Sequence, residues 1–384
     1  MKEKISKYSP EVVKKIYRLA RYKGERHKFL RESGIRKIQD KNIQQQYNPE
    51  HASLIVFLIP GSDWATGKEK IAGGTISIVS ICEQTAAMPQ VHGSQTIMCT
   101  MNGDHLLLKH HMFSNNTDIY RFEQLASFFS KTTSIIIHIP EFLAEHFPAS
   151  LSASDKKWLE KMKHVHFNIM NQNIRLMPTP DKIKGLTELT DKITITTAHQ
   201  KYCTSHYRDF YGVPIHKLSV WISPEQYQYV KWNEKENLLV VSPDSHPIKE
   251  SVLEKLRDID GLKIQIIQNL TYEQYKALIK RAKWALTFGE GLDGYFIEPV
   301  FSGAIAFAVY NEEFFTPDFK DITTAYPSYQ ILQEKIVQDI KLLDKPDSFM
   351  ACQQQQYNLC AKYYNMDQYR SNIKAFYLSD YTYQ

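Results

Sequence analysis

The chain of 384 residues is 43% hydrophobic and 23% charged, a balance typical of a folded globular protein and not of a disordered one. It is too long for one ordinary hydrophobic core, which predicts two domains. Its longest apolar runs, such as LIVFLI at 54–59, are strand-sized and fall short of the ~18–20 residues that span a bilayer. The N-terminus lacks the apolar region of a secretory signal, so we expect a cytoplasmic protein.

The formal net charge of +5 is unevenly distributed. Residues 1–41 contain fourteen Lys and Arg side chains against five Asp and Glu, a net charge of +9, which leaves −4 for the rest of the chain. Val12, Ile16 and Leu19 recur there at helical spacing, which predicts a basic amphipathic helix within an N-terminal extension, residues 1–45. One interpretation is peripheral contact with an anionic membrane, at its inner face, or with a polyanionic substrate; the other is a solvated helix packed on the body. No aromatic-interleaved recognition module accompanies the charge, so we expect no nucleic-acid partner.

The cysteines and acidic pairs argue against a metal site. The odd number of cysteines and the absence of C-x-x-C spacing suit a reducing compartment. The D-x-D pair, Asp258 and Asp260, ends a helical pattern at a turn and does not favour a metal-dependent transferase. We therefore expect no metal or other cofactor, and structural free thiols at Cys82, Cys99, Cys203, Cys352 and Cys360.

The first domain is expected over residues 46–223, where short apolar strands alternate with helical patterns. This alternation predicts βαβ units and a parallel sheet. Strands are expected at 53–60, 95–101, 133–140, 165–170, 192–198 and 216–223, with helices at 75–85, 121–129, 154–164, 180–189 and 206–212.

A polar segment without apolar periodicity, residues 224–236, is the expected linker to a second alternating series at 237–345. The tail at 346–384 has only helical patterns, and we expect it to pack back on the first domain. The fold class is therefore α/β, with two Rossmann-like doubly wound domains whose sheets present their carboxyl ends to a shared cleft. The second series has strands at 236–244, 262–268, 284–290 and 304–310, and helices at 249–259, 271–282 and 295–303.

The stretch GEGLDGYFIEP, which follows the strand at 284–290, allows two interpretations. From Gly289 to Gly294 it spells G-x-G-x-x-G, and Glu312 lies eighteen residues further on, as in an NAD(P)-binding oxidoreductase. Against this, the helix is short and contains Pro299, and Glu290 would place a carboxylate beside a pyrophosphate. The dinucleotide interpretation is therefore the alternative and not the preferred one.

The second interpretation uses the two carboxylates. Glu290 ends the strand and Glu298 lies about two helical turns later, so both can face one side. Carboxylates accept hydrogen bonds from vicinal hydroxyls, and a helix N-terminus favours phosphate. The pattern therefore suits a nucleotide sugar that lies across the start of the helix.

The same residues resemble a known family. GEGLDGYFIEPVFSGAIAFAV is similar to the E-x7-E region of retaining glycosyltransferases with the GT-B fold, of the family 4-like, bacterial surface-polysaccharide type. The resemblance implies that Glu290 contacts the transferred sugar and Glu298 the ribose. Two features depart from the family's pattern. Asp293 stands where the family has its second glycine, and Gly294 follows one place later. The segment SPDSH stands where the family has a basic residue before the lysine.

Other segments extend the resemblance. VVSPDSHPIKESVLEKL is similar to the family's diphosphate-contacting segment and matches its lysine with Lys249. IAGG is similar to a glycine pair that opens the first helix near donor and acceptor, here Gly73 and Gly74, and IIIHIPE to a strand-end histidine, here His138. Each also has a structural explanation: an exposed lysine at a helix start, a glycine helix start, and a core histidine.

Taken together, these observations predict a metal-independent GT-B-like glycosyltransferase that moves a sugar from a nucleotide donor to a glycan or lipid-linked acceptor. Retention and a place in polysaccharide biosynthesis are implied by the resemblance alone. Lys249 and a helix beginning near Gly291 would neutralise the diphosphate. His246 could contact phosphate or transfer a proton, or simply form a loop turn. Alternatives are a nucleotide-sugar epimerase and a non-catalytic sugar-binding module. The candidate catalytic residues are Glu290 and His138, and the candidate donor-binding residues are Glu298, Lys249, Gly291, Asp293, Gly294, His246, Gly73 and Gly74.

Overall fold

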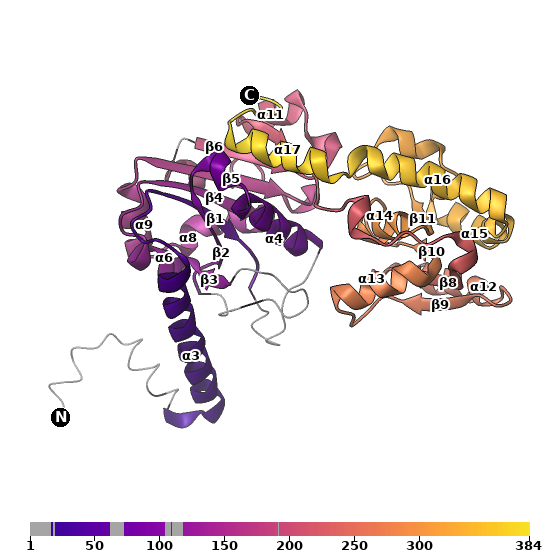
Figure 1. Cartoon of the computed structure of the whole chain (residues 1–384), viewed down its shortest axis with the longest axis horizontal. Coiled ribbons are helices and arrows are strands. Elements are labelled where there is room, and N and C mark those ends of the chain that lie inside the picture. Colours follow the sequence, from indigo (N-terminus) through magenta and orange to yellow (C-terminus); the bar gives the residue numbers. More distant parts are fainter. Residues whose placement is uncertain (1–16, 18–19, 62–72, 104–108, 110–117, 191) are drawn as a thin grey trace.

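Two parallel β-sheets lie side by side along the long axis of the molecule and define its two domains (Figure 1). The computed structural model describes residues 17, 20–61, 73–103, 109, 118–190 and 192–384. The residues that carry the predicted N-terminal periodicity, Val12, Ile16 and Leu19, lie outside these ranges.

The first sheet has seven strands in the order β3-β2-β1-β4-β5-β6-β7, and all its pairings are parallel. Burial on both faces requires continuous apolar runs, and β1 supplies one in which five of six residues are buried. The strands are β1 (Ser53–Leu58), β2 (Gln95–Thr100), β3 (Ile119–Arg121), β4 (Ser134–Pro140), β5 (His164–Asn171), β6 (Lys192–Thr197) and β7 (Ile215–Lys217).

Helices cover both faces of this sheet. The apolar side of α4 packs against β1 and β2, while α6, α8 and α9 join the core cluster on the other face through aromatic side chains such as Phe122, Phe147 and Trp158. The helices are α3 (Lys23–Gln46), α4 (Gly73–Ala86), α5 (Pro89–His92), α6 (Phe122–Phe128), α7 (Glu141–Ala144), α8 (Phe147–Ser150), α9 (Ala153–Glu160), α10 (Lys184–Thr187) and α11 (Ser205–Tyr211).

The second sheet has five strands in the order β12-β11-β10-β8-β9, again all parallel. Its strands are β8 (Glu236–Val241), β9 (Lys263–Ile266), β10 (Ala282–Leu286), β11 (Ile305–Val309) and β12 (Ala325–Tyr326), and its helices are α12 (Lys249–Arg257), α13 (Tyr272–Arg281), α14 (Gly294–Phe301) and α15 (Tyr329–Leu343).

Strand order reverses once in each sheet, between β1 and β4 in the first and between β8 and β10 in the second. At such a reversal the loops leave in opposite directions and open a crevice at the carboxyl ends of the strands. The loops after β4 and β10 therefore start at the two places where a ligand site is expected.

The two C-terminal helices do not pack on the same domain. Helix α16 (Pro346–Tyr363) packs against the second domain, where its Gln356 bonds the backbone of Ala306. Helix α17 (Met366–Tyr377) crosses to the first domain, and its Tyr369 and Ile373 join the cluster beneath α4 (Figure 1). The prediction that the tail at 346–384 returns to the first domain is thus wrong for α16, whose apolar face is covered by α14, α15 and β11.

The basic helix α3 projects from the first domain with its N-terminal half beyond the body (Figure 1). Its C-terminal half is attached by polar contacts, in which Gln39 donates to the carbonyl of Ile119 and Asn42 to the carboxylate of Asp118. Within the described residues, no helix is long and apolar enough to cross a membrane.

Candidate active site

The loop between β10 and α14 carries the E-x7-E pattern, and its glycines have separate structural reasons. Gly291 has φ 93°, and a Cβ there would lie 2.9 Å from the carbonyl oxygen of Val309 and against the ring of Phe315. A Cβ on Gly294 would lie 2.8 Å from Oε1 of Glu298. The chain's own backbone therefore requires glycine at 291, whereas a side chain at 294 would displace the Glu298 carboxylate.

Helix α14 begins at Gly294, one residue before the helix expected at 295–303 and three residues after the start near Gly291 that was expected to face the diphosphate, and Asp293 caps it. The Asp293 carboxylate accepts the backbone N–H of Phe296 at 3.2 Å and the hydroxyl of Thr287 at 3.0 Å. Burial raises its pKa to about 7. Asp293 thus has a capping role, and its carboxylate takes up part of the helix N-terminus that was expected to face phosphate.

Glu298 lies within the second domain beneath this helix start. It is 7% exposed and accepts a hydrogen bond from the hydroxyl of Tyr272 at 3.2 Å, while Tyr272 also bonds the hydroxyl of Tyr227 at 2.9 Å. Burial raises the pKa of Glu298 to about 8, against an ordinary value of 4.5. A carboxyl in such a site costs stability when it ionises, which is a common property of functional residues.

Glu290 lies at the carboxyl end of β10, at the reversal of the second sheet, and is half-buried. Its Oε1 accepts a hydrogen bond from Nδ2 of Asn173, in the first domain, at 2.5 Å. Burial raises its pKa, the nearby Arg175 lowers it, and Asp244 raises it. Glu290 is therefore a carboxylate that faces the other domain across the cleft.

Two more of the predicted donor-binding residues follow β8: His246 in the loop and Lys249 at the start of α12. The Lys249 ammonium donates to the backbone carbonyls of Ser242 and Asp244, at 2.6 and 2.8 Å, and partial burial lowers its pKa. The ring of His246 stacks on Tyr329, with centroids 3.7 Å apart. Lys249 thus already binds its own loop, and His246 packs in an aromatic stack.

Asp244 in this loop lies close to the glycine stretch. Its Oδ2 is buried without a hydrogen-bond partner and would be 2.8 Å from a Cβ on Gly289. Gly289 therefore lets the Asp244 carboxylate approach the loop that carries Glu290, a contact that a larger residue would prevent.

His138, predicted as a catalytic residue, does not reach the cleft. It is 1% exposed, stacks on Phe57 and has both ring nitrogens engaged, with the hydroxyl of Tyr377 and the amide of Asn168, each at 2.9 Å. Burial holds its pKa well below the ordinary value. The prediction is corrected: His138 is a core histidine covered by α17.

The strand-end position belongs to Glu141, which sequence reasoning missed. It follows Pro140 directly after β4, is 2% exposed and accepts the backbone N–H groups of Gln172 and Asn173, each at 3.2 Å. Burial raises its pKa to about 7, and Glu290 raises it further through charge repulsion. An acidic residue immediately after the apolar strand predicted at 133–140 was the signal that could have identified it.

Gly73 and Gly74 form the first turn of α4, which lies beside Gln172 of the turn that Glu141 holds. A Cβ on Gly73 would meet no atom of the described chain within 4 Å, and one on Gly74 would lie 3.7 Å from the Gln172 side chain. The packing of the described residues does not require glycine at 73. This helix start lies next to Gln172.

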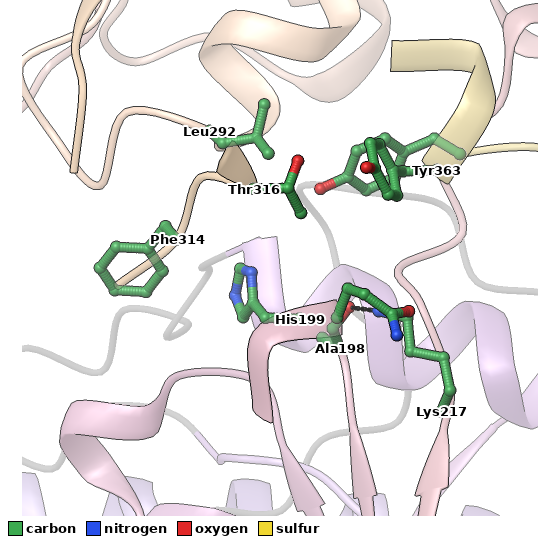
Figure 2. Close-up of a pocket in the computed structure, with 9 residues that line it drawn as sticks. Ala198, His199, Lys217, Leu292, Phe314, Thr316 and Tyr363 are labelled. Carbon is green, nitrogen blue, oxygen red and sulfur yellow. Dashed lines mark hydrogen bonds between the residues drawn. The ribbon is translucent and has the colours of Figure 1, made fainter. Parts of the chain in front are cut away.

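A small pocket opens between the domains (Figure 2). Burial lowers the pKa of Lys217 to about 7 and that of His199 to about 4, and the Lys217 ammonium donates to the carbonyl of Ala198. Figure 2 shows Leu292, from the Glu290 loop, on the opposite wall. The pocket is lined by Ala198, His199, Gln200, Lys217, Leu292, Phe314, Thr316, Tyr363 and Tyr364.

Two further observations concern other ligands. The Glu312 side chain, the acidic residue of the dinucleotide interpretation, is 73% exposed and pairs with Lys320 at 3.2 Å. In the part of the chain that the structure describes, no group of three or more His, Cys, Asp or Glu side chains is arranged to hold a metal ion.

Comparison with known proteins gives similarity at the level of structure. No family model matches the chain, and curated protein sequences give no match. Sucrose-phosphate synthase from Thermosynechococcus elongatus superposes with a TM-score of 0.55 at 11% identity, over 85% of this chain and 98% of that one. The Anabaena protein HepE, solved with UDP-glucose, gives 0.51 at 8% identity, over 85% and 99%.

A Listeria monocytogenes protein proposed to be a UDP-N-acetylglucosamine 2-epimerase also superposes, with a TM-score of 0.51 at 9% identity, over 85% of this chain and 96% of that one. Together with the two parallel sheets, these matches settle the architecture. The chain has a GT-B-like fold. At such low identity the similarity extends to the fold alone.

Within this GT-B-like fold, polar contacts join the loops of the two domains. Besides Asn173 and Glu290, Arg175 pairs with Glu313 at 2.5 Å and packs over the ring of Phe314. Asn173 and Glu290 therefore meet between the domains, and Glu141 holds the turn that carries Asn173. The start of α4 lies beside Gln172 of the same turn, whereas His138 takes no part in these contacts.

Proposed function

We propose that the protein is a glycosyltransferase that uses a nucleotide-sugar donor. The observation that carries this proposal is the position of Glu290 at the strand reversal of the second sheet, where it faces the polar strand ends of the first domain. The similarity of the fold to proteins that include sucrose-phosphate synthase and the UDP-glucose-bound HepE supports it. The E-x7-E resemblance supports it independently, because it concerns the residues of that same loop.

In this proposal, Glu290 accepts hydroxyl groups of the donor sugar and Glu298 those of the ribose. Lys249 offers its remaining N–H to the diphosphate, and the leaving phosphate is stabilised by preorganised charge and dipoles, with no metal. Tyr272 occupies Oε2 of Glu298, and Oε1 is the oxygen that would accept from the ribose. Retention of configuration and a role in polysaccharide biosynthesis belong to the proposal through the resemblance only.

A nucleotide screen tests the donor class. We expect UDP, GDP, dTDP or CMP to bind in calorimetry, and the corresponding nucleotide sugar to release its nucleotide on incubation with the protein. Variant Glu290→Gln keeps the shape of the loop and should still bind the nucleotide. It should cleave the nucleotide sugar, and so produce free nucleotide, much more slowly. Binding of NAD with no binding of any of the four nucleotides would overturn the proposal.

A second candidate, a nucleotide-sugar epimerase on the same fold, is favoured by one feature. Glu141 and Glu290 are carboxyl groups from opposite domains whose pKa values are both raised by burial, as acid–base catalysis at neutral pH requires. NMR of the reaction products separates the two candidates. A transferase or donor hydrolase releases free nucleotide, whereas an epimerase converts the nucleotide sugar to an isomer and releases none at first.

We also propose that α3 attaches the protein to an anionic membrane surface at its cytoplasmic side, near a lipid-linked acceptor. Exposed basic side chains, Arg26, Arg31 and Lys37, alternate there with exposed Tyr22 and Leu30. Each basic residue near such a surface contributes roughly 1 kcal/mol. Reversing these three charges to Glu should therefore abolish co-sedimentation with vesicles of phosphatidylcholine and phosphatidylglycerol. Equal binding to pure phosphatidylcholine vesicles would contradict this electrostatic contact.

A further inference from the structure

The turn at Gln172–Asn173, directly after β5, is the part of the first domain that touches Glu290. It is held from two sides within its own domain. The Glu141 carboxylate accepts both of its backbone N–H groups, and Nε2 of His199 lies 3.2 Å from the carbonyl oxygen of Gln172. The turn is thus fixed by side chains from the ends of two other strands, β4 and β6.

Asn173 has a defined orientation in this turn. Its Oδ1 accepts the backbone N–H of Arg175 at 3.0 Å, which directs Nδ2 away from the turn and onto Oε1 of Glu290. A flipped amide would place Oδ1 against the Glu290 carboxylate and leave the Arg175 N–H without its acceptor. One oxygen of Glu290 is therefore held by the first domain, and the other, Oε2, remains for a ligand hydroxyl.

We propose that Asn173 and Glu141 are positioning residues: Glu141 fixes the turn, and the turn presents Asn173, which orients Glu290 from the opposite domain. The proposal rests on the assigned role of Glu290 in the transferase reaction. Because the Asn173–Glu290 bond crosses the cleft, it can form only when the two domains are in this relative placement. Orientation of the sugar-contacting carboxylate is thereby coupled to closure of the cleft.

The protonation state of Glu141 affects this arrangement. The ionised carboxylate can accept both N–H groups of the turn, whereas protonation converts one oxygen to a donor and weakens one of those bonds. Since the pKa of Glu141 is about 7, the turn is held best above neutral pH. His199, with a pKa of about 4, stays neutral in this range. The charged groups near the pair are Glu290 for Glu141, and Arg175, Asp244, Glu313 and Asp293 for Glu290, of which Asp293 has a pKa of about 7.

Three variants and a control test the proposal. Asn173→Ala removes the cross-domain bond, Glu141→Gln removes the ionisable acceptor, and His199→Ala releases the same turn without changing a group that titrates near neutrality. Glu145→Gln is the matched control, because Glu145 lies just after α7 but pairs with Lys182 away from the cleft. Turnover of the UDP, GDP, dTDP and CMP sugars is measured from pH 5.5 to about 9, a range that brackets the Glu141 pKa of about 7.

We expect Asn173→Ala and Glu141→Gln to lower kcat on the order of 10- to 100-fold, the effect of misplacing a reacting group by about 1 Å, and to leave nucleotide affinity within about twofold. The wild type should gain activity as pH rises through about 7. Glu141→Gln should lack this rise, His199→Ala should keep it, and Glu145→Gln should match the wild type. Unchanged kcat in both Asn173→Ala and Glu141→Gln, or an unchanged pH profile in Glu141→Gln, would overturn the proposal.

Hydrogen exchange gives a readout that does not depend on any donor. In Asn173→Ala and Glu141→Gln, amide exchange should increase in the turn at 171–175 and also across the cleft at 287–292, whereas exchange in Glu145→Gln should not change. Increased exchange confined to the first domain would overturn the coupling between domains. If the wild type turned over no nucleotide sugar, the proposed function would fail, and the exchange data would still decide the positioning.

Discussion

The loops of the two domains that meet at the cleft are assembled in different ways. In the second domain, Glu290, Asp293 and Glu298 come from one stretch of nine residues, and a strand end, a cap and one helix set their spacing. In the first domain, Glu141 and the 172–173 turn come from two separate strand ends, and only the sheet order brings them together. The second domain therefore has a local motif, whereas the first has a site that exists only in the folded sheet.

The largest expected effect tests the motif. Glu290→Gln keeps the acceptor oxygen for Asn173 but removes the charge, and loss of one such transition-state contact typically costs on the order of 10²- to 10³-fold in kcat. Nucleotide affinity should be nearly unchanged. Steady-state kinetics and calorimetry measure the two quantities, and Glu313→Gln, an exposed interdomain carboxylate, is the control. Equal losses in both variants would mean that Glu290 acts only as an interface residue.

Asn173→Asp tests the first domain by adding a charge at the contact instead of removing the amide. It would place a second carboxylate at the 2.5 Å contact with Glu290, so the two groups would not both ionise readily. We expect kcat to fall on the order of 10- to 100-fold at neutral pH and the apparent pKa of the activity to rise. The pH profile of kcat distinguishes this from a loss of folding, and a profile identical to that of Asn173→Ala would exclude contact with Glu290.

A smaller effect concerns Glu298. Its pKa in the folded protein, about 8, exceeds the ordinary 4.5, so its burial costs no stability below about 4.5 and progressively more as pH rises to about 8. The Glu298→Gln side chain cannot ionise, so the variant avoids this loss of stability. Its amide oxygen can still accept the hydrogen bond from Tyr272. In thermal unfolding, Tm of the variant should exceed that of the wild type at pH 8 by about 2–4 °C per kcal/mol recovered, and by much less at pH 5.

The same Glu298→Gln variant should bind nucleotide more weakly, by about tenfold, if the carboxylate contacts ribose hydroxyls. Calorimetry at pH 8 measures this affinity. A variant that gains stability and keeps full nucleotide affinity would show that Glu298 is a buried carboxyl with no part in the donor site.

The smallest effect compares two glycines. Gly73→Ala should change Tm little, because a Cβ there meets no described atom, whereas Gly291→Ala should destabilise the second domain through its φ of 93° and the contact with Val309. If a donor or acceptor approaches α4 closely, Gly73→Ala should still raise KM. A KM equal to that of the wild type would remove Gly73 from the site.

The sequence allowed the loop of the second domain to be predicted, but not the site of the first domain. Alternating apolar runs correctly indicated parallel sheets and most strands, but β3 and β12, with three and two residues, are too short to form a pattern. The loop of the second domain could be identified from the spacing of Glu290 and Glu298. Asp293 was assigned to ligand binding, although Asp before a helix is itself an N-cap signal. The positions of Glu298 and Lys249 follow the predicted elements, while their roles in donor binding stay predictions.

The first-domain residues could not be found in this way. His138 stands where the resemblance expects a ligand, but α17, which follows more than 220 residues later, covers it, and such a distant contact leaves no local signal. Glu141 and Asn173 each look like ordinary residues after a strand. Their function as a pair depends on the register of β4 with β5, which composition and periodicity do not determine.

The path of α17 has a mechanical consequence. The polypeptide passes between the domains twice, through residues 218–235 and again where α16 gives way to α17 at Tyr364. A body attached at two points can rotate about the line that joins them but resists twisting about any other axis. We therefore expect the two domains to open by rotation about this single axis, which moves Glu290 away from Asn173. Cleaving the chain at Tyr364 would leave a single attachment, and the domains would lose this guidance while both sheets stayed intact.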